Sequence, residues 1–431
     1  MAPVTIAAAG SEDRAAHVLA IFLGIALVGA VATFATTRIY ARLQRYRWVA
    51  ALTAGGWFAT MVGLILGPRV LGVVDEDGLG PLRPLLEVAL VWIGLIVGLQ
   101  LRRTLVQAIP GMLRRWILVD SAIAVPVGAA FTIAVGYLLI DDWQRVLAVG
   151  PGFALIIAFL SWTPETRSLR PHLSPRTGDL SQVIQAGGGL GAVISIVAFS
   201  LANRLFGTSG NFMSLDGPVG GLVDLLLVLV TSALLGFGAR ILLRRTSGSS
   251  QEVLVITLAI VLLATGFTNR LDIDPVLGGL LLGAIFANLR DPHLRDLERG
   301  LQSAEPGMAV LLLLGCGTLA SGGHLGMALG IGTAIAGVRL LVKPMVARRM
   351  LGPAFPDLSR RDPLFYGPAR VPMIAIAIAS APVLESSTRP AATILGAVMV
   401  AMLLGALTPA IAGLRPAPAE PSVRRSDEVS A

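Results

Sequence analysis

Long apolar runs alternate with short polar loops along nearly the whole chain. The runs show no period-two alternation, and most are about 17–25 residues long. A helix of that length crosses a hydrocarbon core of about 30 Å at about 1.5 Å per residue. The pattern predicts an all-α membrane protein rather than a barrel. The predicted spans are residues 17–36, 48–67, 85–101, 116–139, 145–163, 180–202, 219–240, 252–268, 275–289, 305–320, 325–347, 368–384 and 390–414.

Composition and charge agree with about thirteen transmembrane helices. Hydrophobic residues make up 55% of the 431 residues and charged residues only 14%, whereas soluble chains carry about 25% charged residues. The net charge of +8 comes from arginines that gather in alternate loops. This distribution indicates topology rather than nucleic-acid binding, and the positive-inside rule places these loops in the cytoplasm. We therefore expect a multi-pass protein of the cell (inner) membrane, with its N-terminus outside and its C-terminus cytoplasmic.

The domain organisation expected is one transmembrane domain over residues 1–414. Thirteen helices fit the inverted-repeat plan of secondary transporters, although no sequence repeat is visible. The first half would cover about 17–202, a linker helix 219–240, and the second half 252–414. Residues 415–431 are rich in proline and charge, so we expect a disordered tail.

Two predicted helices are interrupted near proline. In the fifth, Thr163-Pro164 leads into the polar stretch that begins with Glu165, and in the twelfth Arg370 and Pro372 lie near the start. Proline removes a backbone donor and breaks the helix ladder, and broken helices at mid-membrane often hold ions in transporters. The alternative is that both are ordinary helix ends.

Several segments resemble the cation/proton antiporter superfamily, in particular its bacterial sodium/proton exchanger and potassium-efflux branch. These segments are Gly63-Leu-Ile-Leu-Gly67-Pro68 in helix two, Leu85-Leu-Glu87 through Gly98-Leu-Gln100 in helix three, and Asp274-Pro-Val-Leu-Gly278-Gly279 in helix nine. Arg339-Leu-Leu-Val-Lys343 in helix eleven and Leu407-Thr408-Pro409 in helix thirteen follow in the family's order. The set spans roughly residues 55 to 410.

The resemblance implies a homodimer in which a mobile core domain moves against a scaffold. Helices five and twelve would cross as broken helices in the core, and the activity would be secondary antiport of a monovalent cation, sodium or potassium, against protons. It implies no enzyme activity.

The chain departs from the family's pattern at the ion site. Helix six of the family usually carries an Asp-Asp or Asn-Asp pair, but here no acid occurs between Leu180 and Asn203. Arg370-Val371-Pro372 replaces the usual "R-G-E" of helix twelve, so that acid is also missing.

The remaining acids and bases within predicted helices are candidates for ion translocation. A carboxylate inside a membrane is costly unless a proton or cation neutralises it. Asp120 lies inside helix four, and Glu165 lies beside the break at Thr163 and Pro164. The alternatives are that Asp120 pairs with interfacial arginines and that Glu165 is a solvated loop residue. Glu87 is expected to cap the outer end of helix three.

Arg339 lies near the middle of helix eleven, where a charge costs about 2.5–3.5 kcal/mol. It is a candidate to offset half-helix carbonyls, to pair with Asp120 or to bind an anion, and a structural charge is the alternative. Lys343, one turn further, either reaches the interface or carries a proton. For Arg370 a structural role is favoured over a catalytic one.

Other chemistries find no support in the sequence. The four histidines are scattered, no phosphate-binding glycine loop occurs and Cys316 is the only cysteine, so we expect no metal, cofactor or nucleotide. Two functional alternatives stay open: the same fold adapted to another solute such as an anion, and a transport-inactive regulatory membrane subunit.

Overall fold

The computed structural model describes residues 57–71, 76–103, 190–201, 218–245, 250–271, 274–289, 294–351 and 389–411, with scattered residues in 107–134 and 376–384. Within these ranges the regular structure is helical and contains no strand, as the apolar pattern predicts. The helices are α4 (Trp57–Leu66), α5 (Glu76–Leu99), α11 (Pro218–Arg244), α12 (Ser250–Arg270), α13 (Pro275–Asn288), α14 (Leu294–Ser321), α15 (Leu325–Leu351) and α17 (Arg389–Ile411). When only the described residues are counted, none of these helices is both long and apolar enough to cross a membrane.

The predicted positions agree with the observed helices, and the largest differences are at two N-termini. α5 begins at Glu76 rather than at 85, and α14 begins at Leu294 rather than at 305. In α14 the added turns contain charged residues, but Leu297 and Leu301 lie one turn apart and are fully buried. Burial of these two leucines stabilises a helical segment that hydropathy alone assigns to a loop.

α13 shows why its sequence starts a helix where it does. Asp274 is the N-cap, and its Oδ1 accepts a hydrogen bond of 3.0 Å from the backbone N–H of Val276. Pro275 follows at the first helical position, where its missing N–H has no cost. This arrangement fixes the start of α13 at the predicted residue.

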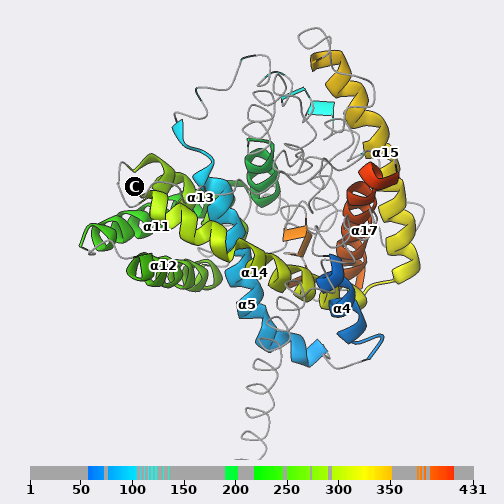
Figure 1. The fold of residues 1–431 in the computed structure, drawn as a ribbon, viewed down its shortest axis with the longest axis horizontal. Helices are drawn as coiled ribbons and strands as arrows, with labels where there is room; N and C mark the ends of the chain where they lie inside the picture. Colours follow the sequence, from blue (N-terminus) through cyan, green and yellow to red (C-terminus); the bar gives the residue numbers. More distant parts are fainter. Residues whose placement is uncertain are drawn as a thin grey trace, which may run out of the picture.

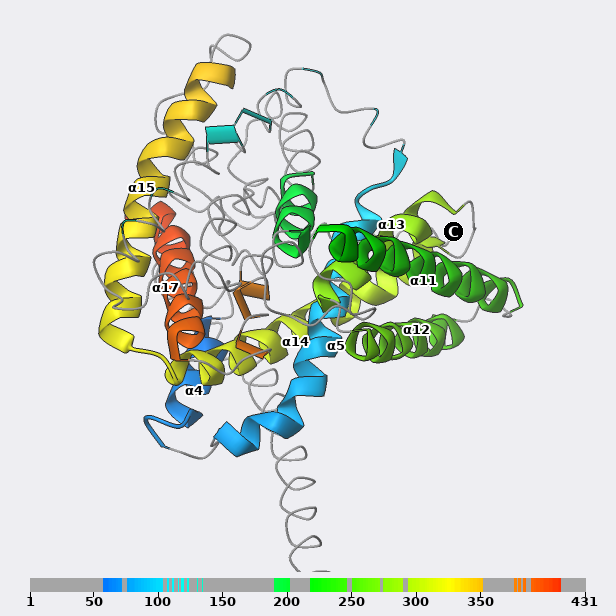
Figure 2. The same cartoon turned by 180° about the vertical axis from the view of Figure 1, so that it is seen from behind.

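The helices pack in pairs (Figure 1). α15 lies along α17, and α11 lies beside α12. α5 packs most extensively against α13, while α4 packs against α14. The reverse view in Figure 2 shows the same neighbours.

α5 and α13 cross with their backbones in contact. A Cβ atom added to Gly94 would lie 2.2 Å from the carbonyl oxygen of Val276, and one added to Gly279 would lie 2.1 Å from that of Val91. Further along, a Cβ atom on Gly98 would lie 2.2 Å from the Leu280 oxygen, so the two helices run in the same direction. Small residues allow such an approach, which is a common way for helices to associate in membranes.

α4 and α14 cross in the same manner. A Cβ atom on Gly63 would lie 2.1 Å from the carbonyl oxygen of Leu314, and one on Gly317 would lie 2.4 Å from that of Thr60. The close approach continues beyond the end of α4, where Gly67 meets the side chain of Ser321.

The two crossings share two equivalent backbone contacts. When residues 60–67 are matched with 276–283 and residues 314–321 with 91–98, the contact of Gly63 with Leu314 falls on that of Gly279 with Val91, and the contact of Gly317 with Thr60 falls on that of Gly94 with Val276. Each crossing joins one helix of the predicted first half to one helix of the predicted second half. The equivalence is therefore what an internal repeat would produce, although the sequence showed none.

Candidate functional site

Most of the predicted ion-translocation residues lie outside the described part of the chain. These are Asp120, Thr163, Pro164, Glu165, Arg370 and Pro372. Their roles, and the predicted breaks in helices five and twelve, therefore stay predictions.

Arg339 and Lys343 have their backbones on α15. Gly332 faces α17, because a Cβ atom there would lie 2.5 Å from the carbonyl oxygen of Ala397. Ile335 is fully buried and Leu341 is 75% exposed. Arg339 follows Gly332 and Ile335 at helical spacing, so its Cα lies on the same side of α15 as these two residues. The exposed residue Leu341 lies on another side of the helix. The register therefore agrees with an interior position for this part of α15.

A buried contact joins the residue 190–201 helix to the start of α13. The hydroxyl of Ser200 donates a 2.6 Å hydrogen bond to Oδ2 of Asp274, and both residues are buried. Asp274 thus caps α13 with one oxygen and binds Ser200 with the other. In the sequence Asp274 was noted in the segment that resembles the family's helix nine, and its position directly before Pro275 is the signal that predicts a cap.

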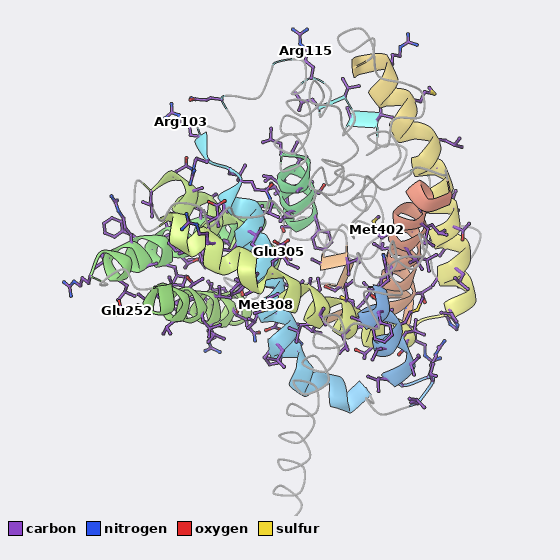
Figure 3. The ribbon with its side chains drawn as sticks, viewed as in Figure 1. Arg103, Arg115, Glu252, Glu305, Met308 and Met402 are labelled. Atoms are coloured by element: carbon purple, nitrogen blue, oxygen red, sulfur yellow. The ribbon has the colours of Figure 1, made fainter. Side chains whose placement is uncertain are left out.

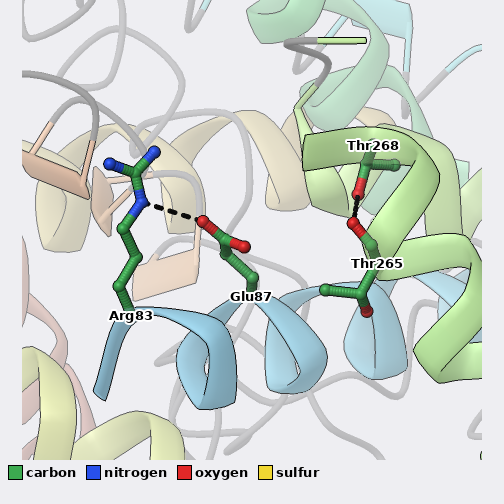
Figure 4. Close-up of polar contacts among 4 residues, drawn as sticks. All are labelled: Arg83, Glu87, Thr265 and Thr268. Carbon is green, nitrogen blue, oxygen red and sulfur yellow. Dashed lines mark hydrogen bonds and ion pairs between the residues drawn. The ribbon is translucent and has the colours of Figure 1, made fainter. Parts of the chain in front are cut away.

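A second buried carboxylate lies midway along α5. Nε of Arg83 donates a 2.9 Å hydrogen bond to Oε1 of Glu87 (Figure 4), and the Glu87 side chain is only 8% exposed. Its Oε2 is buried and has no hydrogen-bond partner among the described residues. The expectation that Glu87 caps the outer end of its helix is wrong, because α5 begins at Glu76, three turns earlier.

A small cavity between α11, α12 and α13 has three hydroxyl groups on its wall. Its volume is about 10 Å³, on the scale of one water molecule. Thr231 and Ser232 line it from α11, and Thr268 lines it from α12, where its hydroxyl donates to the carbonyl of Thr265. Figure 4 draws this threonine pair in the same close-up as Glu87. The cavity shows that polar groups are enclosed among these helices.

Figure 3 labels two arginines that follow the predicted third helix. Arg103, just beyond the end of α5, and Arg115 lie at the end of the molecule where α15 also ends. α5 is the predicted third helix and α15 is the predicted eleventh helix. The predicted topology gives these two helices the same direction. In the described ranges no group of three or more histidine, cysteine, aspartate or glutamate residues is placed to hold a metal.

The described part of the chain contains two buried acids. In the described part of the chain the buried acids are Glu87 and Asp274. A buried carboxylate is unstable without a compensating charge, hydrogen bond or proton. Glu87 and Asp274 are therefore the buried positions of negative charge in the described part of the chain.

Comparisons with known proteins give consistent results. The family model for "Sodium/hydrogen exchanger, transmembrane" matches residues 56–412. Among solved structures, the sodium/proton antiporter MjNhaP1 from Methanocaldococcus jannaschii aligns with a TM-score of 0.59 at 17% identity, covering 94% of this chain and 99% of that one. None of the curated proteins matches the chain. At this identity the structural likeness concerns the fold, and the family match concerns most of the chain.

Proposed function

The chain belongs to the sodium/hydrogen exchanger family, and from that premise we propose that it exchanges a monovalent cation, sodium or potassium, for protons. The match over residues 56–412 carries the proposal. Proteins of this family are multi-pass integral membrane proteins that transport ions and are not enzymes. The likeness to the fold of a sodium/proton antiporter supports the same conclusion.

The architecture proposed for exchange is an inverted repeat that acts as a homodimer, with the N-terminus outside and the C-terminus cytoplasmic. The equivalent crossings of α4 with α14 and of α5 with α13 support the repeat. Repeats of opposite orientation supply two similar halves whose relative movement can expose one site to each side in turn.

The ion pathway is proposed to involve the residues near the predicted helix breaks. Asp120 and Glu165 would supply carboxylates, Thr163 would supply a hydroxyl, and the breaks at Pro164 and Pro372 would free backbone groups. Arg339, Lys343 and Arg370 would offset the negative ends of broken helices. The interior register of Arg339 on α15 supports this role.

Reconstitution tests the function directly. Liposomes that contain the full chain and a pH-sensitive dye should show proton movement when sodium or potassium is added, and the two cations added separately identify the ion. Asp120→Asn should abolish or uncouple this exchange. No cation-dependent proton flux between about pH 5 and 9, where histidine and perturbed carboxylates titrate, would exclude the proposal and leave a transport-inactive subunit.

Anion transport is a second candidate function. The 180–203 segment has no acid, while the Cα of Arg339 lies on the side of α15 that faces α17 at Gly332. In this case uptake of an inorganic anion would occur without any cation requirement. Arg339→Ala would abolish that uptake, whereas the cation/proton proposal expects no anion uptake from either protein.

A further inference from the structure

We propose that Glu87 is a proton-carrying carboxylate that alternates between an ion pair with Arg83 and a protonated, unpaired state. The inference rests on the proposed exchange function and adds a proton site on α5 to it. Its starting point is the contact geometry around one buried acid.

The two oxygens of Glu87 have different surroundings. Oε1 accepts the hydrogen bond from Nε of Arg83 at 2.9 Å. Oε2 is buried, and none of the residues that the structure describes donates a hydrogen bond to it. An arginine can bind both oxygens of a carboxylate through two parallel N–H groups, but here it binds one. The ionised form of Glu87 is therefore only half compensated.

Burial makes this half-compensation costly. Glu87 is only 6% exposed, and its neighbours along α5, Leu86, Leu90 and Val91, are also buried. Among the described residues with an unpartnered buried side-chain atom, Glu87 is the only acid. A neutral orphan group is tolerated far more readily than an orphan charge, so a proton on Oε2 removes the larger part of the penalty.

Arg83 can move away from Glu87 because it lies at the surface of the protein. Its side chain is 45% exposed, against 8% for Glu87. Helical ion pairs four residues apart contribute little, and less when the base precedes the acid. Arg83 can therefore turn outward and keep its charge solvated, while Glu87 stays buried.

The change of Glu87 from the ion pair to the protonated state is a simple proton uptake. The hydrogen bond from Nε of Arg83 to Oε1 breaks, a proton from water forms an O–H bond on Oε2, and the guanidinium remains charged. The reverse step releases the proton and restores the ion pair. About 18 Å of helix separates Glu87 from the end of α5 at Leu99, at 1.5 Å per residue. With that end at the cytoplasmic face, as the predicted topology has it, the carboxylate lies in the outer half of a hydrocarbon core about 30 Å thick.

The helices packed on α5 carry other charged or titratable groups. In the part of the chain that the structure describes, only Arg83 lies within ion-pair distance of Glu87. The other groups are Asp274 capping α13, Glu298, Arg299, Glu305 and Cys316 on α14, and Glu252 and Arg270 on α12.

Infrared difference spectra of the purified full chain test proton uptake without requiring transport. Acidification should produce a protonated-carboxyl signal with one component that is missing in Glu87→Gln and kept in Glu252→Gln, a matched change at an exposed acid. In Arg83→Leu this component should change, because the ion-pair partner of Glu87 is gone, and Arg83→Lys should restore it. An unchanged signal in Glu87→Gln or in Arg83→Leu overturns the proposal; the Arg83 variants decide it if Glu87→Gln does not fold.

Liposome flux separates this proposal from the proposed function. If the wild-type chain exchanges cations for protons, Glu87→Gln should lose the pH dependence of exchange while Glu252→Gln retains it. Unaltered pH dependence in Glu87→Gln would contradict a transport role for Glu87. If the wild-type chain shows no exchange, the proposed function fails and the transport role of Glu87 fails with it, while the infrared result still decides proton binding.

Discussion

A Cβ atom on Gly279 would lie 2.1 Å from the carbonyl oxygen of Val91, so α13 and α5 cross with no room for a side chain between them. The equivalent relationship, also 2.1 Å, joins Gly63 of α4 to Leu314 of α14. Because the obstructing atoms belong to the backbone, neither crossing can yield by turning a side chain. Stability should therefore be sensitive to one methyl group at these glycines.

Gly279→Ala should destabilise the protein by about 1–3 kcal/mol, the usual cost of overpacking, and Gly63→Ala should behave alike. Gly266→Ala is the control, since nothing lies within 4 Å of its Cβ position on α12, and alanine there should be neutral or stabilising by up to about 1 kcal/mol. Thermal unfolding of the detergent-solubilised chain measures all three. Equal melting temperatures for Gly279→Ala and Gly266→Ala would contradict the close crossing.

Ser200→Ala should cost about 1.5–3 kcal/mol, the range for a hydrogen bond to a charged group, because it leaves Oδ2 of Asp274 without its 2.6 Å donor. Ser195→Ala is the matched control in the same helix. Ser195 is also buried, but its hydroxyl donates only to the carbonyl of Gly191 within the helix. The same unfolding measurement should show a clear loss for Ser200→Ala alone, and a similar loss for both would attribute the effect to burial rather than to Asp274.

Asp274→Ala should lower stability by about 0.5–2 kcal/mol through loss of the α13 cap, in addition to the loss of the Ser200 contact. Asp274→Asn can still accept the hydrogen bond from Val276 and should retain most of the cap. The difference between these two variants, measured by thermal unfolding, reports the cap. If both variants were equally unstable, the negative charge rather than the cap would carry the effect.

Arg339→Ala should reduce cation-dependent proton flux in liposomes to background, because the proposed pathway needs its charge to offset the negative ends of broken helices. Leu341→Ala changes a side chain that is 75% exposed two residues away, and it should leave the flux unchanged. Wild-type flux in Arg339→Ala would remove Arg339 from the mechanism.

Cys316 should resist thiol reagents in the folded protein. Its side chain on α14 is fully buried, and it is the only cysteine in the chain. Labelling with a maleimide should therefore occur only after denaturation, as detected by intact-mass measurement. Complete labelling of the native protein would show that α14 opens at this position.

The sequence by itself determined the helical class, the approximate places of most described helices and the family resemblance. These features are local or additive: apolar runs, a proline after an N-cap aspartate, and short motifs in a fixed order. The starts of α5 and α14 were missed because hydropathy assigns charged turns to loops, whereas packing of Leu297 and Leu301 keeps such turns helical.

Tertiary structure alone decided the burial of Glu87 and the pairing of Ser200 with Asp274, which are 74 residues apart. It also decided the equivalence of the two glycine crossings, for which no sequence repeat had been visible. The physical reason is that each depends on the register between helices. Spacing along the chain places Arg83 one turn from Glu87, but only the packing of helices around α5 decides that no described residue pairs with the second oxygen of Glu87.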